Sequence, residues 1–417
     1  MLPVFLFFSC KEKKTRQTVF SNTSFPIDSL TAYVKNNFKT LVDTSFMPND
    51  SGMVAMAVFL MNDDSVLVDK AYFFSNYSNP LPNDSTIFQM GSVTKTFTAA
   101  LIARQVNLGK MTLNELAQTY LPQGNGKGSV PELPVFPNSA GDTVGITLGN
   151  LATMNSGLDR DAPIDKKNKS TPYLNSFSYL DTAHLLYQPG DNCYFYSNLG
   201  FGILGLIASK MVYPDSANYY DKFEQVVVDS LLNSLRMNDT RINLNQGQQK
   251  RLAIPYPKGI GYGNPGWPMN YAAGALYSTL SDMKLYAKEM IGLGSYISIK
   301  DLDTLLSPRS FVDYNMIKYK CWDINNTPAE KQAMAWVVSI NKDKKLIDTI
   351  YSKDGKTGGF STFITFSKPI VNGVQYKAYV VLWANSNKFS NPGKSNIGML
   401  ADSVLQKIYN LAVVSKK

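Results

Sequence analysis

The residues best suited to chemistry are Ser92 and Lys95, three positions apart at the start of a predicted helix. Gly91 ends a strand-like segment, the pattern over 94–108 is helical, and Gly109 is suited to cap that helix. This spacing places both side chains on one helical face, one turn apart. A serine becomes a useful nucleophile when a neighbouring base takes its proton, and Lys95 would be that base if burial lowers the pKa of its amine. A serine N-cap followed by a surface lysine has the same spacing, so the pair needs support from elsewhere.

Two other segments carry residue types that would complete such a site. Tyr196 and Asn198 stand at the start of another predicted helix, and Lys356-Thr357-Gly358 opens a predicted strand after a turn. Each pattern alone is also that of an ordinary helix start or hairpin connection. Their occurrence together, each at the boundary of an element, favours a single cleft where one hydroxyl, two amines and a phenol meet.

The chain has one histidine, His184, and this count excludes several other kinds of site. A Ser-His-Asp triad would have to pass through it, and a zinc site built from several histidines is impossible. It lies in a short segment predicted to be helical, and we interpret it as a packed or exposed residue rather than a base. No metal and no cofactor is expected. Cysteines 193 and 321 are compatible with a disulfide or with two free thiols.

The spacing of apolar residues divides the chain into strand-rich ends and a helical middle. A helix is predicted at 27–41, then a hairpin of an apolar strand at 53–61 and a shorter strand at 66–68. Helices are predicted in the middle at 94–108, 148–154, 182–187, 199–211, 220–235 and 281–291. Strands are predicted again at 335–340, 346–351, 361–366 and 375–383, and a final helix at 396–413.

These elements predict an α/β fold of the α+β kind. Hairpins dominate, so we expect an antiparallel sheet built from the N- and C-terminal segments, flanked by helices, with an inserted all-helical domain. The expected units are a signal and polar linker at 1–25, a sheet domain formed by 26–90 and 295–417, and a helical domain at 91–294. The helical domain would carry Ser92, Lys95 and Tyr196. A chain of 417 residues is long enough for two such domains.

Through these three motifs the sequence resembles the serine β-lactamase and penicillin-binding protein family. It is most similar to the class C β-lactamases and their DD-peptidase and esterase relatives, over roughly residues 30–412. Met154 stands where relatives commonly carry a histidine, and no class A glutamate motif is found. The resemblance implies a β-lactamase/transpeptidase-like fold, in agreement with the predicted elements.

The resemblance also implies how the acid and base would work. Ser92 would attack a carbonyl and form an acyl-enzyme. Lys95 and Tyr196 would form a coupled acid–base unit, with the tyrosine as phenolate or proton relay. Asn198 would hold Lys95 and the substrate amide by hydrogen bonds.

A second group of residues would bind the substrate. Lys356 and Thr357 would bind the carboxylate that penicillins and D-Ala-D-Ala peptides share. The oxyanion would be met by the backbone N–H groups of Ser92 and Gly359. Gly358 and Gly359 would let the substrate lie against the strand edge, because neither has a side chain.

The function implied is that of a serine hydrolase, with hydrolysis of β-lactam amides as the leading activity. A D-alanyl-D-alanine carboxypeptidase or endopeptidase acting on peptidoglycan stem peptides would use the same residues, and an esterase or D-amino-acid amidase is a further alternative. The non-enzymatic alternative is an inactive cell-wall binding protein. That alternative predicts loss of the reactive serine or lysine, and both are present.

The first residues resemble the end of a bacterial lipoprotein signal. Cys10 follows an apolar stretch that ends in a small residue, and lysines and an arginine come directly after it. Cys10 would then be the lipidated first residue of the mature chain, and a basic tether beside the anchor would favour an anionic leaflet. This predicts a periplasmic protein anchored in the bacterial cell envelope. The alternative is a hydrophobic terminus with an incidental cysteine.

The charge of the chain supports no nucleic-acid role. There are 41 basic and 32 acidic residues, a formal charge of +9, but the lysines are dispersed and form no basic stripe with aromatic residues. The expected partner is a small molecule, a β-lactam or a peptidoglycan-derived D-Ala peptide. Contact with a membrane is expected only through the N-terminal anchor.

Overall fold

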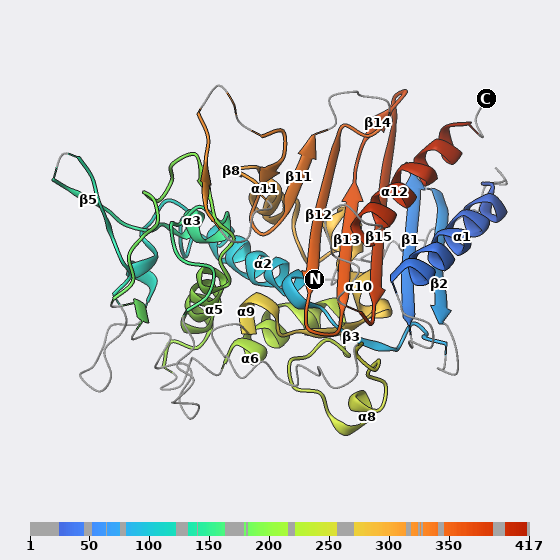
Figure 1. The fold of residues 1–417 in the computed structure, drawn as a ribbon, viewed down its shortest axis with the longest axis horizontal. Coiled ribbons are helices and arrows are strands. Elements are labelled where there is room, and N and C mark those ends of the chain that lie inside the picture. Colours follow the sequence, from blue (N-terminus) through green and yellow to red (C-terminus); the bar gives the residue numbers. More distant parts are fainter. Residues whose placement is uncertain are drawn as a thin grey trace, which may run out of the picture.

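A computed structural model describes most of the chain (Figure 1). The described residues are 25–45, 52–63, 65–75, 81–121, 132–139, 141–162, 179–180, 182–215, 222–256, 271–313, 318–323, 326, 328–340, 346–386 and 397–414. Among them, no helix is long and apolar enough to cross a membrane. Cys10 lies outside the described residues.

An antiparallel sheet joins the two ends of the chain, as predicted. Its strands run in the order β2-β1-β15-β13-β12-β11-β10-β8, so N-terminal β1 pairs directly with C-terminal β15. The strands are β1 (Met53–Asn62), β2 (Ser65–Ser75), β8 (Ser310–Phe311), β10 (Lys331–Gln332), β11 (Val337–Ile340), β12 (Thr349–Lys356), β13 (Ser361–Ser367), β14 (Ile370–Val371, paired with β15) and β15 (Val374–Ala384).

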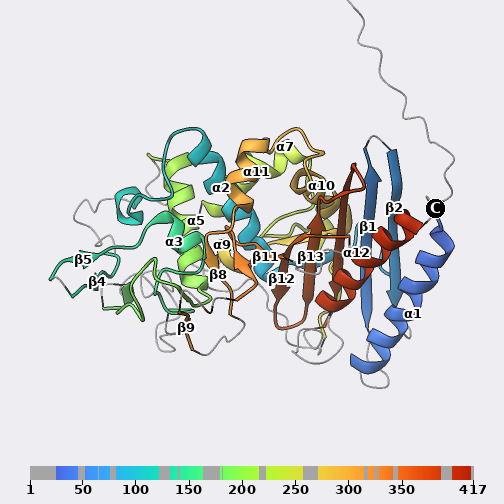
Figure 2. The same cartoon turned by 90° about the horizontal axis from the view of Figure 1, so that it is seen from above.

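The continuous apolar sequence of β1 is explained by burial of both faces of the sheet. Val54, Met56 and Val58 pack with helices α1 (Ile27–Ser45) and α12 (Ile397–Val414). The intervening residues, such as Ala55 and Phe59, join the core on the opposite face. Figures 1 and 2 show α1 and α12 side by side on the outer face of the sheet. Side chains that alternate between two buried faces must be apolar on both.

The middle of the chain lies against the inner face of the sheet. Its helices and helical turns are α2 (Thr94–Asn107), α3 (Leu148–Ala152), α5 (Asn198–Val212), α6 (Phe223–Val227), α7 (Asn233–Leu235), α8 (Gln246–Gln249), α9 (Tyr271–Gly274), α10 (Leu280–Met290) and α11 (Ile299–Leu306), with 3₁₀ turns η1 (Gly91–Val93) and η2 (Ala117–Tyr120) and a π-helical segment η4 (Val228–Leu232) that joins α6 to α7. Helix α10 packs on β1, β13 and β15, so one core is continuous from the sheet into the helices. The domain boundaries at 90/91 and 294/295 stay a prediction.

Short strands also occur within the helical region. They pair as β3 (Ile87–Gln89) with β7 (Tyr277–Thr279), β4 (Phe136–Pro137) with β5 (Thr143–Val144), and β6 (Cys193–Tyr194) with β9 (Lys320–Cys321). The β6–β9 pair brings Cys193 opposite Cys321, and the two form a disulfide. The region inserted between the sheet strands is therefore mainly, not entirely, helical.

Besides strand β2, which is longer than the predicted 66–68, two predicted elements differ from the structure. The described part of 182–187 is irregular rather than helical, because Leu185 and Tyr187 are buried and the Leu186 N–H donates to Gly157 O instead of to its own turn. Strand β12 begins at Thr349 and extends to Lys356, later than the predicted 346–351, because its register with β13 continues to the end of that hairpin. The second difference changes the identity of a site residue.

Candidate active site

The start of α2 presents Ser92 where the helical region meets β12. Gly91 has φ of +53°, and a Cβ at that position would lie 2.8 Å from the backbone nitrogen of Lys356. Only glycine combines this left-handed conformation with so close an approach. The preceding Met90 carbonyl accepts a 2.7 Å hydrogen bond from Thr362 Oγ1, which ties the segment to β13. Ser92 itself is half-buried, so its hydroxyl is held on a rigid element yet within reach of a ligand.

Lys95 is fully buried, and its amine contacts the serine. Nζ lies 3.2 Å from Ser92 Oγ and donates 2.7 Å hydrogen bonds to Asn198 Oδ1 and Ala273 O. Burial lowers the pKa of the Lys95 ammonium, and the positive charges of Lys353 and Arg160 lower it further, against the opposing effect of Tyr196. The predicted convergence of Ser92, Lys95 and Asn198 is present in the structure.

The orientation of Asn198 is set by a carboxylate. Its Nδ2 donates to Asp161 Oδ1 at 2.8 Å, and because a carboxylate only accepts, the amide oxygen is left to face Lys95. Asp161 Oδ2 in turn lies 3.3 Å from Nε of Arg160, whose carbonyl accepts the N–H of Asn198. Sequence reasoning did not identify Arg160 or Asp161 as part of the site.

Tyr196 is buried among three cationic side chains. Its ring centroid lies 4.9 Å from Lys95 Nζ, 5.2 Å from Arg160 Cζ and 5.4 Å from Lys353 Nζ. Burial alone would raise the pKa of the phenol, but the positive charges of Lys95 and Lys353 outweigh it and leave that pKa below its ordinary value. A phenol in this setting can exchange a proton with the neighbouring amine.

The second amine at Tyr196 is that of Lys353, not of the predicted Lys356. Side chains alternate along a strand, so residues three apart point to opposite sides. Lys353 is 3% exposed and reaches Tyr196, whereas Lys356, at the end of β12, is exposed. The sequence contains two successive Lys-x-Gly triplets, 353–355 and 356–358, and the prediction chose the wrong one for this position. A Cβ on Gly355 would lie 2.0 Å from Met90 O, so the first triplet is the one pressed against the serine segment.

The backbone nitrogen that lies beside Gly91 and Ser92 belongs to Lys356, whereas the prediction named Gly359 for the oxyanion. Thr357 N–H donates to Phe360 O, so in the alternating pattern of an antiparallel pair the Lys356 N–H points away from β13. That nitrogen lies against Gly91, next to Ser92. Gly359 packs against Pro255, because a Cβ there would lie 2.2 Å from Cβ of Pro255. Thr357 and Gly358 form the turn between β12 and β13 and not the strand edge beside the serine.

Lys353 differs from Lys95 in its partner. Its Nζ donates to Asp354 Oδ1 at 2.7 Å, and the Asp354 side chain is 53% exposed. Burial alone would lower the pKa of the Lys353 ammonium, but the Asp354 carboxylate reverses this and raises it. Lys353 is therefore a fixed cation with its own counter-ion.

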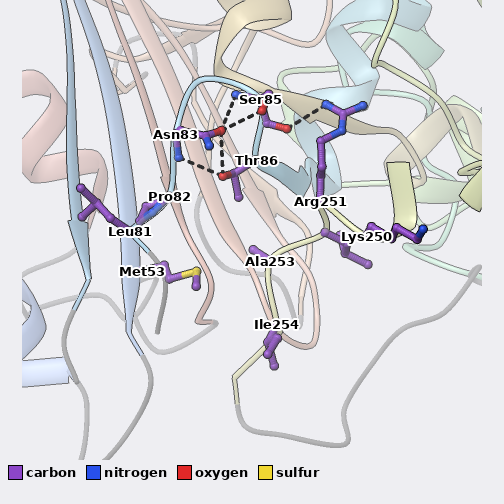
Figure 3. Close-up of a pocket in the computed structure, with 11 residues that line it drawn as sticks. Met53, Leu81, Pro82, Asn83, Ser85, Thr86, Lys250, Arg251, Ala253 and Ile254 are labelled. Carbon is purple, nitrogen blue, oxygen red and sulfur yellow. Dashed lines mark hydrogen bonds between the residues drawn. The ribbon is translucent and has the colours of Figure 1, made fainter. Parts of the chain in front are cut away.

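Other candidate residues lie away from this cluster. His184 is exposed, in agreement with its interpretation as a residue without catalytic use. No group of three His, Cys, Asp or Glu side chains among the described residues is placed to hold a metal ion. A hollow of about 390 Å³ at the start of β1 is lined by Met53, Leu81, Arg251 and Ile254, among others, and by none of the cluster residues (Figure 3). Arg251 there is held by Asp239.

Comparison with known proteins agrees with this geometry. The model of the beta-lactamase family matches residues 34–401. This chain belongs to the beta-lactamase family. Its relatives in this family of serine hydrolases are distant in sequence.

Two of these relatives illustrate how low the sequence identity is. "Beta-lactamase-like protein 4" of Dictyostelium discoideum is 22% identical over 390 residues, 87% of this chain and 63% of that protein. This chain therefore spans less than two thirds of that relative's length. The "D-alanyl-D-alanine-carboxypeptidase/endopeptidase AmpH" of Escherichia coli K12 is 25% identical over 322 residues, 75% of this chain and 76% of the relative.

Solved structures share the fold. A beta-lactamase/D-alanine carboxypeptidase from Yersinia pestis, complexed with citrate, has a TM-score of 0.66 at 20% identity and covers 94% of this chain and 99% of its own. A class C beta-lactamase mutant has a TM-score of 0.64 at 20% identity, with 91% and 97% covered. The predicted fold class, a mixed α/β fold with a large antiparallel sheet flanked by helices, is confirmed.

Proposed function

We propose that this protein is a serine acyl hydrolase that forms an acyl-enzyme through Ser92. The observation that carries the proposal is the hydrogen bonding of Lys95. Asn198 Oδ1 and Ala273 O only accept, so they take two N–H groups of the amine. A neutral amine then has its lone pair left for the Ser92 hydroxyl, 3.2 Å away. Burial beside other cations favours that neutral state.

Acylation follows from these contacts. Ser92 Oγ bonds to the substrate carbonyl carbon as its proton passes to the Lys95–Tyr196 pair. The bond from that carbon to the leaving nitrogen or oxygen then breaks, and the pair returns the proton to the leaving atom. The backbone N–H groups of Ser92 and Lys356 would stabilise the oxyanion, and Lys356 here replaces Gly359, the residue predicted from the sequence. One such donor is typically worth about 10²–10³ in rate.

In deacylation water is the nucleophile and Ser92 Oγ is the leaving atom. Water attacks the acyl carbon, its proton passes to the same pair, and the ester bond to Ser92 Oγ breaks as that oxygen is reprotonated. Tyr196 is the residue best placed to serve this step, because adjacent positive charges lower the pKa of its phenol.

The names of the relatives supply two substrate classes, β-lactam amides and D-alanyl-D-alanine peptides. We extend both to this chain, with β-lactam turnover as the activity to assay first. Uncharged esters are a second candidate, favoured by the Lys353–Asp354 ion pair because the amine near Tyr196 already has a counter-ion.

Covalent labelling tests the proposal. We expect both a fluorescent penicillin and a fluorescent fluorophosphonate, which carries no carboxylate, to label the wild type, and Ser92→Ala to remove both labels. Ser307→Ala, a serine at the end of α11, is the matched control and should label normally. Nitrocefin hydrolysis would show turnover on a β-lactam. Labelling of Ser92→Ala by either probe at the wild-type rate would exclude Ser92 as the nucleophile.

We also propose that the protein resides in the bacterial cell envelope with Cys10 lipidated. The disulfide between Cys193 and Cys321 supports an oxidising compartment, since such bonds are rare where thiols are kept reduced. Expression with labelled palmitate should label the wild type and not Cys10→Ala. Equal labelling of both would contradict the anchor.

A further inference from the structure

The Asp354 carboxylate lies on the amine of Lys353, which takes the place beside Tyr196 that the sequence had assigned to the carboxylate-binding Lys356. Lys353 is 4% exposed in its side chain and Asp354 is 53% exposed, so the ammonium lies beneath its own counter-ion. At 2.7 Å the two form a charge-assisted hydrogen bond. A ligand approaching Lys353 from solvent meets a negative charge first.

The other cations around Tyr196 are also compensated. Arg160 pairs with Asp161 at 3.3 Å. Lys95 directs two N–H groups to Asn198 and Ala273, and its pKa is lowered by burial. Among the described side chains that contact the Tyr196 ring, no cation is left without a counter-ion or a lowered pKa.

The carboxylates of Asp161 and Asp354 both lie next to residues that contact the acid–base pair. Asp161 accepts a hydrogen bond from Asn198, and Asn198 accepts one from Lys95. Asp354 follows Lys353 on β12, whose pairing with β11 ends at Ser352. Residues 353–356 of β12 extend beyond the pairing with β11, so this edge of the strand can bind a ligand beside Ser92.

We infer that Asp354 is a specificity-determining residue that favours acyl substrates whose leaving group carries no carboxylate, such as uncharged esters and amides, over the carboxylate-bearing β-lactams and D-alanyl peptides to which the proposed function also extends. A leaving-group carboxylate would have to displace Asp354 from Lys353 or lie beside it, and like charges at close range repel. This inference rests on the proposed acyl-enzyme mechanism.

A matched pair of substrates tests it. Hippuryl thioglycolate and its methyl ester contain the same thioester and differ in one leaving-group carboxylate, and release of the thiol reports both reactions. We expect the wild type to have a kcat/KM about tenfold or more higher for the methyl ester. Asp354→Asn should reduce that preference about tenfold, because one unit charge near the leaving group is removed. Asp354→Ser should act in the same direction.

The controls separate this inference from the proposed function. Asp142→Asn makes the same charge change in the hairpin between β4 and β5 and should leave the preference unchanged. A wild type that prefers the carboxylate substrate, and loses this preference in Lys356→Met, would overturn the inference and restore Lys356 as the carboxylate site. A preference that changes less than twofold in both Asp354 variants would also overturn it. Failure of the function itself would appear differently, as labelling that survives Ser92→Ala.

Discussion

Two buried lysines lie at similar distances from the Tyr196 ring, yet their surroundings give them opposite properties. Lys95, on α2, has neutral acceptors, and the pKa of its ammonium is lowered by burial. Lys353, on β12, has a carboxylate, and the pKa of its ammonium is raised despite burial. Burial alone does not decide whether a lysine is a base or a fixed cation. The charge of its nearest partner does.

The largest expected effect is loss of the base. Lys95→Met should reduce the acylation rate by about 10³-fold, within the range of general acid–base catalysis, because Ser92 loses its proton acceptor. Stopped-flow acylation by the fluorophosphonate measures this rate. Lys110→Met, an exposed lysine after α2, is the control. If both variants were acylated at the wild-type rate, Lys95 would not be the base that accepts the proton of Ser92.

Tyr196→Phe should reduce turnover by about 10²-fold, since the phenol shares the proton with Lys95. The variant keeps the ring against the three cations, so its stability should change little. Steady-state kcat on the methyl ester substrate, with Tyr319→Phe as the control, measures the effect. A kcat unchanged from the wild type would leave Lys95 as the sole acid–base group.

Neutralising Lys353 and neutralising Asp354 should shift the pH dependence of kcat/KM in opposite directions. Lys353→Met removes a positive charge, which favours the ammonium of Lys95 and disfavours the phenolate of Tyr196, so the pKa of each rises. The rising limb of kcat/KM should therefore shift to higher pH by about one unit. Asp354→Asn removes a charge that raises the pKa of Tyr196, so the limb should shift to lower pH. Shifts in the same direction would contradict the electrostatic account.

The smallest effect concerns the stability of the fold and the carboxyl of Asp402, which has no cationic partner among the described residues. Burial raises the pKa of Asp402, on α12, to about 6. Because the folded-state pKa is above the ordinary value, ionisation destabilises the fold, and the loss grows from about pH 4 to pH 6. Asp402→Asn should therefore raise the free energy of unfolding at pH 8 by about 1–2 kcal/mol, and by much less at pH 4. Urea unfolding at the two pH values measures it, and an equal change at both would show a cause other than ionisation.

Local spacing was enough to predict part of the site. Ser92 and Lys95 lie one helical turn apart, and the geometry of a helix alone brings them together. Tyr196 and Asn198 were recognised at a helix start, and the sheet was expected from hairpins at both ends of the chain. Arg160, Asp161 and Asp354 were missed because a charged residue in a loop or at a strand end carries no local sign of what it will contact.

The sequence by itself determined most of the elements and the pairing of Ser92 with Lys95, since these depend on residue type and on periods of two and 3.6 residues. Only the tertiary structure decided which Lys-x-Gly triplet reaches Tyr196. That choice depends on where β12 enters the turn to β13 and on how closely Gly355 and Gly91 let two segments approach, and a displacement of three residues reverses the side of the strand.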